Sequence, residues 1–342
     1  MKRIIVPLDG SPLAERALST AVMLARPTSE GGDSSVVELV LVHAPLTLAA
    51  MPDGGIVCAP STEFDTELRQ QSEAYLYRVA ARLRAETRLN VVSTVLDGSP
   101  SMTLAAHAEA VGADVIVMTS HGRGGLSRVW LGSVTDALVR QGHVPVLVTR
   151  SLEDAAPAAD DAPFRRVLVP LDGSGLGEET LDSAIALLGV TGVEYTLARV
   201  LTPLLALFRS TPEGERDEAP RVAASVDQTD EYLEDLAARL CARGVVVRTA
   251  VLVHEHPARA ILRYALRTDT DLVVMATHGR NALGRLVMGS VTDKVLRAGV
   301  VPVLVQRPSR VARAVPESAV RAVHDLARRA GDLVEADASR RP

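Results

Sequence analysis

The sequence contains almost no lysine. Lys2 and Lys294 are the only lysines among its 37 Lys and Arg residues. The phosphate loop of many nucleotide hydrolases has the pattern G-x-x-x-x-G-K-[ST], and this pattern occurs nowhere in the chain. An anion-binding site in this protein would therefore have to use backbone N–H groups, hydroxyl groups or arginine side chains.

Cysteines and long apolar runs are also scarce. Cys58 and Cys241 lie in unrelated contexts and indicate neither a disulfide framework nor a metal cluster, so we expect free structural thiols. No stretch approaches the roughly eighteen apolar residues that a membrane span requires. The first apolar run ends at Asp9, too early for a signal-peptide core. We therefore expect a cytoplasmic protein that starts at or near Met1.

A basic surface is missing as well. The formal charge is −5, and the chain has neither a basic block nor a basic amphipathic helix, which argues against nucleic-acid and membrane partners. What the chain does have is 342 residues, of which 47% are hydrophobic and 23% charged. This composition is typical of a soluble globular protein, and the length allows two domains.

The sequence repeats itself. RIIVPLDGSPLAERAL at 3–18 recurs as RVLVPLDGSGLGEETL at 166–181, and the pairs VMTSHGR and VMATHGR, GSVTD and GSVTD, and VPVLVTR and VPVLVQR follow in the same order. We therefore predict two homologous domains, at 1–150 and 165–307. The segment 151–164 between them is rich in Ala, Asp and Pro and is predicted to be a linker.

Within each copy, strands and helices alternate. Continuous apolar strands separated by helices predict a parallel sheet with helices on both faces. The fold class is thus α/β, with two tandem flavodoxin-like or Rossmann-like domains and a strand order of 3-2-1-4-5 in each. In the first copy we predict strands at 3–8, 36–44, 90–96, 114–119 and 144–149, and helices that start at Ser11–Pro12 and cover 61–88, 101–111 and 133–141.

Ligands of such sheets bind beyond the carboxyl ends of the strands, where the strand order reverses. In the predicted order the first and fourth strands are neighbours, so Asp9 would lie beside the segment 119–132. Gly122 would allow backbone N–H groups to approach an anion closely. Gly132 and Ser133 stand at a predicted helix start, which favours a phosphate, and Asp9 suits a ribose hydroxyl or an exocyclic amine.

The second copy places Asp172, Gly279, Gly289 and Ser290 at the matching positions. Each residue also has a purely structural interpretation. The aspartates could be capping residues of the strand-to-helix turn, and the serines could be helix N-caps. Recurrence of the whole set in both copies favours a binding site.

These motifs together resemble the universal stress protein family in its tandem form, over about 1–150 and 165–307. Family members have a five-stranded flavodoxin-like fold and pair through the fifth strand, and some of them bind ATP. The resemblance implies that the glycines and serines contact phosphate or ribose, that the aspartates contact base or ribose, and that Ala44 and Val200 flank adenine. The implied sites comprise Asp9, Ala44, Met118, Thr119, Gly122, Gly132, Ser133, Val134 and Thr135 in the first half, and Asp172, Val200, Met275, Ala276, Gly279, Gly289, Ser290, Val291 and Thr292 in the second.

Thr119 and Ala276 replace the first glycine of the family's ATP signature, G-x-x-G, nine residues, G-[ST]. A β-branched threonine is expected to crowd the site more than an alanine. The second half is therefore the expected better binder, although Asn281 and Ala282 stiffen its loop.

Histidines suggest two further hypotheses. His121 and His278 adjoin the glycine loop, but no nucleophile and carboxylate recur with them as a catalytic triad requires, so we assign them to hydrogen bonding within the loop. His254 and His256 lie on one side of an extended segment. A metal site there lacks an evident third ligand.

Three segments lie outside the repeated core elements. The long connections 44–60 and 203–220 are either lids over the site or disordered. In the extension 308–342, one helical stripe is predicted to dock on the body or on another subunit; it comprises Val320, Val323, Leu326, Ala330 and Leu333.

Three functions compete. The first is a cytosolic adenine-nucleotide-binding stress regulator or sensor that hydrolyses ATP slowly at most; whether magnesium accompanies ATP stays open. The second is an interaction scaffold with vestigial pockets. The third, a nucleotide-using enzyme, lacks a general base, a carboxylate pair and a catalytic lysine, so we expect no enzyme. The two halves are expected to pair through their fifth strands, which would otherwise leave open edges, and further homodimerisation is left open.

Overall fold

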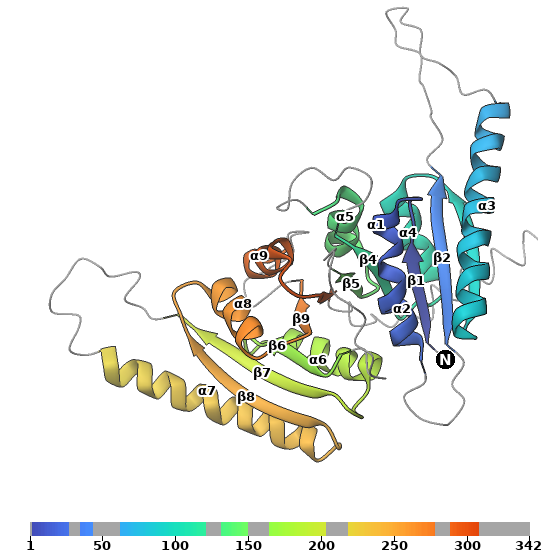
Figure 1. Cartoon of the computed structure of the whole chain (residues 1–342). Coiled ribbons are helices and arrows are strands. Elements are labelled where there is room, and N and C mark those ends of the chain that lie inside the picture. The colour runs from blue at the N-terminus through green and yellow to red at the C-terminus, as the bar shows by residue number, and fades with distance from the viewer. Residues whose placement is uncertain are drawn as a thin grey trace, which may run out of the picture. The chain divides into compact units, whose positions relative to one another are not determined.

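The structure is a computed structural model of the whole chain (Figure 1). It describes residues 2–26, 35–43, 62–120, 131–149, 164–202, 218–277 and 288–307, and all structural statements below refer to these residues. The contacts within the chain group 1–307 into one unit. The predicted C-terminal helix lies outside the described residues.

Both halves contribute to one ten-stranded sheet, with the order β3-β2-β1-β4-β5-β10-β9-β6-β7-β8. All neighbouring strands run parallel except at the junction between β5 and β10. Each half thus has the predicted order 3-2-1-4-5, with the second half reversed. The α/β class and the strand order are confirmed.

The first half contains the elements predicted from the apolar patterns. Its strands are β1 (Arg3–Pro7), β2 (Val36–His43), β3 (Asn90–Asp97), β4 (Val115–Thr119) and β5 (Val146–Thr149), and its helices are α1 (Pro12–Glu15), α2 (Ala17–Ala25), α3 (Thr62–Thr87), α4 (Pro100–Ala110) and α5 (Ser133–Gln141). The predicted first helix is divided at Arg16 into α1 and α2.

The second half repeats this succession. Its strands are β6 (Arg166–Pro170), β7 (Glu194–Leu201), β8 (Val246–Val253), β9 (Leu272–Ala276) and β10 (Val303–Gln306), and its helices are α6 (Gly175–Leu188), α7 (Glu218–Cys241), α8 (Pro257–Arg267) and α9 (Ser290–Ala298). The connection expected at 203–220 therefore ends in helix, because α7 begins at Glu218. None of the described helices is both long and apolar enough to cross a membrane.

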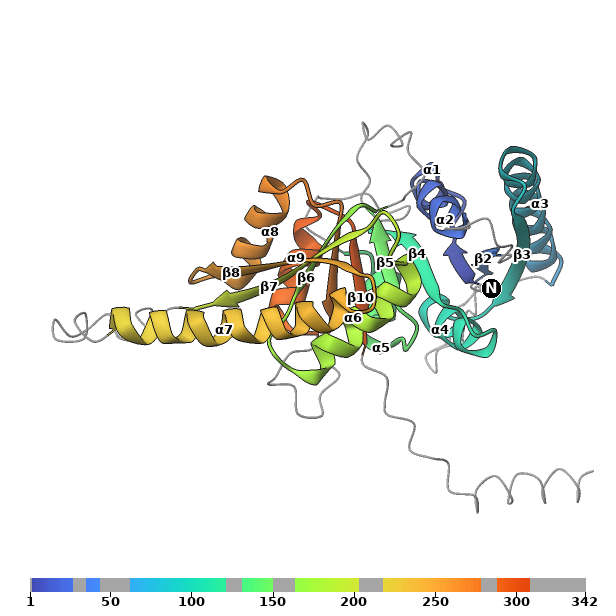
Figure 2. The same cartoon turned by 90° about the horizontal axis from the view of Figure 1, so that it is seen from below.

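Helices cover both faces of the sheet. One face, which we call the long-helix face, packs against α1, α2, α3, α6 and α7 through a cluster of buried aliphatic side chains. The other, the short-helix face, packs against α4, α5, α8 and α9 through a second cluster. Figure 2 shows this layering in the second half, where β7 and β8 run between α7 and α8. Because every central strand is buried on both faces, the strands are predominantly apolar.

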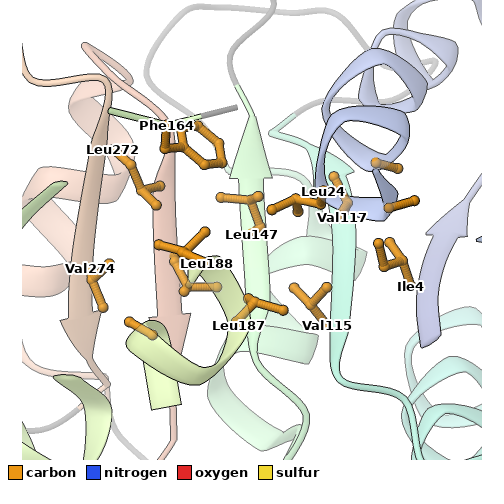
Figure 3. Packing of buried hydrophobic residues seen from close by; sticks show 14 of the residues in the cluster. Ile4, Leu24, Val115, Val117, Leu147, Phe164, Leu187, Leu188, Leu272 and Val274 are labelled. Atoms are coloured by element: carbon orange, nitrogen blue, oxygen red, sulfur yellow. The ribbon is translucent and has the colours of Figure 1, made fainter. Parts of the chain in front are cut away.

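The halves meet at β5 and β10, which pair antiparallel and symmetrically about Leu147 and Leu304. Both leucines belong to the buried cluster of the long-helix face, and their side chains are 0% and 3% exposed. Leu187 and Leu188 of α6 belong to the same cluster, and Figure 3 shows them beside Leu147. The two repeats therefore share a core as well as a sheet.

Candidate functional site

The strand order reverses between β1 and β4 in the first half and between β6 and β9 in the second. The register pairs Ile4 with Val115 and Val167 with Leu272. The carboxyl ends of these neighbouring strands lead to Asp9 and Ser120 in one half, and to Asp172 and Thr277 in the other. The structure thus brings each predicted aspartate to the same sheet edge as the segment that follows the fourth strand of its half.

Backbone hydrogen bonds close the base of each glycine loop. The N–H of Gly132 donates to the carbonyl of Ser120 at 2.8 Å, and the N–H of Gly289 donates to the carbonyl of Thr277 at 2.7 Å. The start of α5 is therefore held against the end of β4, and the start of α9 against the end of β9. Gly122 and Gly279 lie within these loops, outside the described residues, as do His121 and His278.

Both helices that leave these loops begin without a side-chain cap. The N-cap residues are Gly132 and Gly289, so Ser133 and Ser290 are the first helical residues rather than N-caps as the structural interpretation required. Both serine side chains are exposed. The first N–H groups of a helix have no partner within the helix, and an uncapped start is therefore suited to an anion.

Neither N-cap glycine is required by its backbone conformation. Gly132 has φ −56° and ψ 145°, and Gly289 has φ −60° and ψ 141°. Any residue adopts these angles, whereas Gly10 and Gly173, which follow the aspartates, have φ of 82° and 75°. Backbone freedom therefore does not explain the glycines at these two positions; a missing Cβ also allows close approach of another group.

The apolar members of each predicted site lie on the short-helix face. Met118 and Val134 belong to the cluster on that face in the first half, and Met275, Val200 and Val291 belong to it in the second. Both methionines are buried, at 8% and 6% exposure. An apolar platform therefore lies at the end of the sheet from which α5 and α9 begin.

Thr119 is 5% exposed and ends β4. Side chains alternate along a strand, so Thr119 shares the long-helix face with Val115 and Val117, opposite Met118. The same alternation assigns Ala276 to the face of Leu272 and Val274. Both Cβ atoms therefore project to the long-helix face, away from the apolar platform; that Thr119 crowds a ligand stays a prediction.

Thr135 and Thr292 take part in the loop base. Their side chains are 2% and 4% exposed. The Thr135 hydroxyl donates to the carbonyl of Thr119 at 3.4 Å, and the Thr292 hydroxyl donates to the carbonyl of Ala276 at 2.9 Å. These two side chains hold the first turn of the helix against the preceding strand.

Asp9 and Asp172 cap the turns that they begin. Asp9 Oδ1 accepts hydrogen bonds from the N–H of Ser11 at 2.9 Å and from its hydroxyl at 2.6 Å. Asp172 Oδ1 accepts the equivalent bonds from Ser174. The capping interpretation is thus correct for these residues. It is compatible with ligand contact, because a carboxylate can accept about four hydrogen bonds.

The sheet register corrects one predicted equivalence. Val36 pairs with Arg3 on β1, and Glu194 pairs with Arg166 on β6, so Val200 is the counterpart of Val42 and not of Ala44. Val42 and Val200 both pack on the short-helix face. Ala44 lies outside the described residues.

The sequence analysis did not identify a cluster that borders Asp9. The Tyr75 hydroxyl donates to Glu15 Oε1 at 3.0 Å, and Arg82 donates to Glu15 Oε2 at 2.6 Å. Burial, followed by the bond to Glu15, raises the pKa of Tyr75, and the charge of Asp9 adds to this shift. The cluster joins α3 to α1, next to the turn that carries Asp9.

The second half contains the same cluster. The Tyr232 hydroxyl donates to Glu178 Oε1 at 3.0 Å, and Arg239 donates to Glu178 Oε2 at 3.2 Å. Burial, followed by the bond to Glu178, raises the pKa of Tyr232 to about 12. Arg199 lies 5.7 Å from the centre of the Tyr232 ring. Recurrence of Glu, Tyr and Arg at matching places in both copies was the sequence signal for these clusters.

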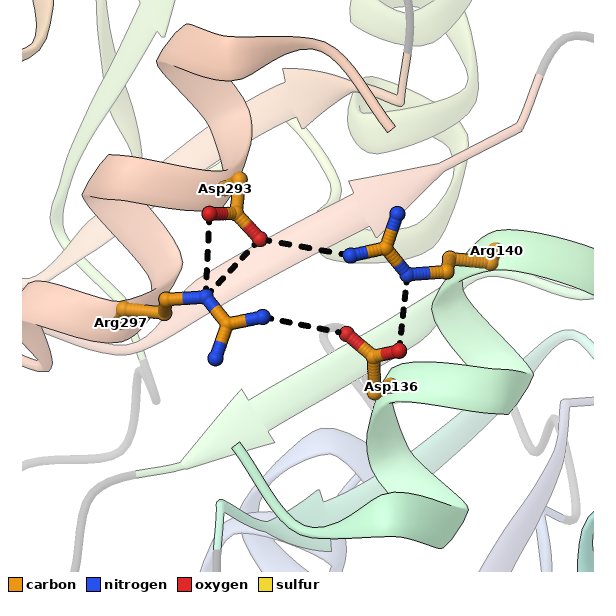
Figure 4. Close-up of polar contacts among 4 residues, drawn as sticks. All are labelled: Asp136, Arg140, Asp293 and Arg297. Carbon is orange, nitrogen blue, oxygen red and sulfur yellow. Dashed lines mark hydrogen bonds and ion pairs between the residues drawn. The ribbon is translucent and has the colours of Figure 1, made fainter. Parts of the chain in front are cut away.

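An Asp and an Arg that recur in both copies form contacts between the two halves. Asp136 and Arg140 of α5 and Asp293 and Arg297 of α9 form the ion-pair network drawn in Figure 4. Its sequence signal was an Asp and an Arg four residues apart, directly after GSVT in both copies.

The histidine pair at the end of β8 lies in the predicted proximity. The ring centres of His254 and His256 are 5.9 Å apart, and the N–H of His256 donates to His254 Nδ1 at 2.9 Å. Across the described part of the chain, no third His, Cys, Asp or Glu joins them in a metal-binding arrangement.

Comparisons with known proteins agree on one family. The family model described as "Universal stress protein family" matches residues 1–150 and 163–307. The universal stress protein Rv2005c of Mycobacterium tuberculosis is 33% identical over 229 residues, which cover 66% of this chain and 72% of that protein. Rv1996 of the same organism, also named a universal stress protein, is 26% identical over 325 residues, covering 89% and 94%.

A solved structure shares the fold. The crystal structure of a universal stress protein from Archaeoglobus fulgidus superposes with a TM-score of 0.61 at 19% identity, and the match covers 90% of this chain and 97% of that chain.

Proposed function

Because the chain belongs to the universal stress protein family, we propose that it binds an adenine nucleotide, ATP, in one or both halves. In this proposal the protein is a cytoplasmic stress-response regulator or sensor. Nucleotide occupancy changes its conformation or its choice of partner, and ATP is hydrolysed slowly at most.

The observation that carries the proposal is the pair of uncapped helix starts at Gly132 and Gly289. Each start is fixed beside the end of a central strand by a backbone hydrogen bond, and each has a glycine that its backbone conformation does not require. A polyphosphate would be held there by the first N–H groups of α5 or α9 and by the hydroxyl of Ser133 or Ser290. No lysine is needed for this mode of binding.

The apolar platform supports adenine as the base. Val42, Met118 and Val134 lie on one face of the sheet, next to the helix start, and could pack against a flat ring. The second half offers Val200, Met275 and Val291. Asp9 and Asp172, at the neighbouring strand ends, are the candidate partners of the ribose or of the exocyclic amine.

One observation favours the alternative of an interaction scaffold with vestigial pockets. Asp9 and Asp172 already accept hydrogen bonds from the serines that follow them, so the turns explain these aspartates without a ligand. The scaffold alternative does not explain the glycines at both N-caps. We therefore keep it as the second candidate.

The test is nucleotide release and thermal stabilisation. Freshly purified protein is denatured, the released nucleotide is identified by chromatography, and the melting temperature is measured with and without ATP. Binding at a hundred times the Kd would stabilise the native state by about 2.7 kcal/mol per site. Gly132→Glu together with Gly289→Glu is expected to abolish both the released nucleotide and the shift, because each carboxylate would occupy a phosphate position.

Leu266→Glu is the matched charge control. Leu266 is 60% exposed near the carboxyl end of α8, and the new charge there is expected to leave ATP binding unchanged. Wild-type protein that releases no nucleotide and shows no ATP-dependent shift would establish the scaffold alternative instead.

A further inference from the structure

The ion-pair network between α5 and α9 consists of two acidic and two basic side chains. Arg140 contacts Asp136 of its own helix at 2.7 Å and Asp293 of the other half at 3.5 Å. Arg297 contacts Asp293 at 2.9 Å and Asp136 at 3.4 Å. Each arginine is therefore shared between the two halves, as Figure 4 shows.

The four side chains are partly shielded from water. Their exposures lie between 27% and 30%. A network of four charges with this burial is expected to interact more strongly than an isolated surface pair, which is usually worth less than 1 kcal/mol. Arg307, which follows β10, also donates to the carbonyl of Gln141 at 3.2 Å and so joins the end of α5 to the second half.

Each aspartate of the network lies one helical turn from a proposed phosphate site. The N–H of Asp136 donates to the carbonyl of Gly132 at 2.8 Å, and the N–H of Asp293 donates to the carbonyl of Gly289 at 2.9 Å. Both residues belong to the first turn of their helix. A polyphosphate at the helix start would therefore add negative charge close to a carboxylate that depends on the shared arginines.

We propose that this network couples the two nucleotide sites, so that ATP bound in one half lowers the affinity of the other half. The proposal rests on the function proposed above. The anion at one helix start attracts both arginines towards its own end of the network. The aspartate at the other helix start then has less positive charge beside it, and a second polyphosphate binds there against a stronger negative potential.

The coupling can be measured by calorimetric titration with ATP. Gly132→Leu and Gly289→Leu each block one site without adding charge, and each variant yields the association constant of the remaining site. For independent sites, the product of these two constants equals the product of the two stepwise constants of the wild-type protein. We expect the wild-type product to be about fivefold smaller, at the lower end of common coupling energies.

The same titrations are then made in a chain whose network is neutral, with Asp136→Asn, Arg140→Gln, Asp293→Asn and Arg297→Gln. The Asp→Asn changes keep the size of the side chain, the Arg→Gln changes shorten it but keep a polar amide, and together they leave no unpaired charge; the fivefold difference is expected to disappear. A second measurement needs no change to the network. In about 1 M salt, where the Debye length is about 3 Å, the difference between the two products is expected to shrink towards zero.

The outcomes separate this proposal from the proposed function. Equal products in wild-type protein, a difference that persists in the neutral network or in high salt, or binding confined to one half would each overturn the coupling while nucleotide binding stands. Absence of ATP binding in wild-type protein would overturn both.

Discussion

At the scale of single residues, the first half pairs a buried glutamate with a partly buried histidine. Glu38 is 5% exposed in the middle of β2, and its Oε1 lies 2.8 Å from His107 Nε2 on α4 and accepts a hydrogen bond from the Thr94 hydroxyl at 2.8 Å. A carboxylate buried to this extent needs such partners. The equivalent positions of the second half hold Thr196 and Tyr264, so the cluster belongs to one half only.

His107→Ala is expected to destabilise the protein by about 3 kcal/mol, because it leaves the carboxylate of Glu38 buried with one partner fewer. Equilibrium unfolding in urea measures the loss. The control is the double variant Glu38→Thr with His107→Tyr, which installs the pair of the second half and is expected to stay within about 1 kcal/mol of wild type. A single variant as stable as wild type would mean that Glu38 finds other partners.

At the scale of elements, two glycines at helix ends differ in the space available for a Cβ atom. A Cβ at Gly142, after α5, would lie 2.7 Å from the carbonyl oxygen of Leu138. A Cβ at Gly175, the first residue of α6, would meet no heavy atom within 4 Å, and its φ is not positive. The end of α5 therefore requires glycine and the start of α6 does not.

Gly142→Ala is expected to destabilise the protein by about 1–3 kcal/mol, because a backbone atom must move to admit the methyl group. Gly175→Ala is the matched control and is expected to stabilise by about 0.5 kcal/mol, since it restricts the unfolded chain at no cost to the fold. Thermal unfolding of both variants provides the comparison. If both variants changed the stability equally and in the same direction, the space around the new methyl group would not determine the effect.

The boundaries of the elements were largely predictable because turn-forming and helix-starting residues, such as Gly, Pro and Ser, mark them in the sequence. The predicted helix at 133–141 coincides with α5, and the helix predicted at 61–88 is α3 at 62–87. Register was less predictable. Ala44 and Val200 were assigned to matching places from the family resemblance, and a strand that is buried on both faces offers little alternation to fix its alignment. Only the hydrogen bonds to β1 and β6 establish the match with Val42.

The candidate site was predictable in its backbone parts and less so in its side-chain contacts. The glycines and serines at the helix starts stand out because they recur in both copies. The bonds from Tyr75 and Arg82 to Glu15 join residues more than fifty positions apart, and no periodicity predicts that distance. From the sequence alone, Arg82 would be taken for an exposed charged residue of the helix surface, with no indication of its contact with Glu15.

At the scale of the whole molecule, the shared core at β5 and β10 makes the two repeats mutually dependent. Leu147 is fully buried and packs in one cluster with residues of both halves, including Phe164 and Leu188 (Figure 3). Loss of packing at this point is therefore expected to loosen both repeats.

Leu147→Ala is expected to destabilise the protein by about 2–5 kcal/mol through the cavity that it leaves. Hydrogen exchange measured by mass spectrometry should rise in peptides from α6 as well as in those from β4 and β5. Leu83→Ala, at a buried position of α3 away from the junction, is the control, and its effect is expected to centre on α3, β2 and β3. Faster exchange confined to the first half in Leu147→Ala would contradict the shared core.

The antiparallel pairing of β5 with β10 has a consequence for how the sequences of the two repeats can evolve. Two identical subunits that paired through the same strands as β5 and β10 would have to carry the same side chains at every matching position, because one gene specifies both. Joining the copies in one polypeptide removes that constraint, so Glu38 and His107 can exist in one repeat while Thr196 and Tyr264 occupy the other. Every molecule then carries one repeat of each kind in a fixed ratio of one to one, and the two repeats can diverge independently.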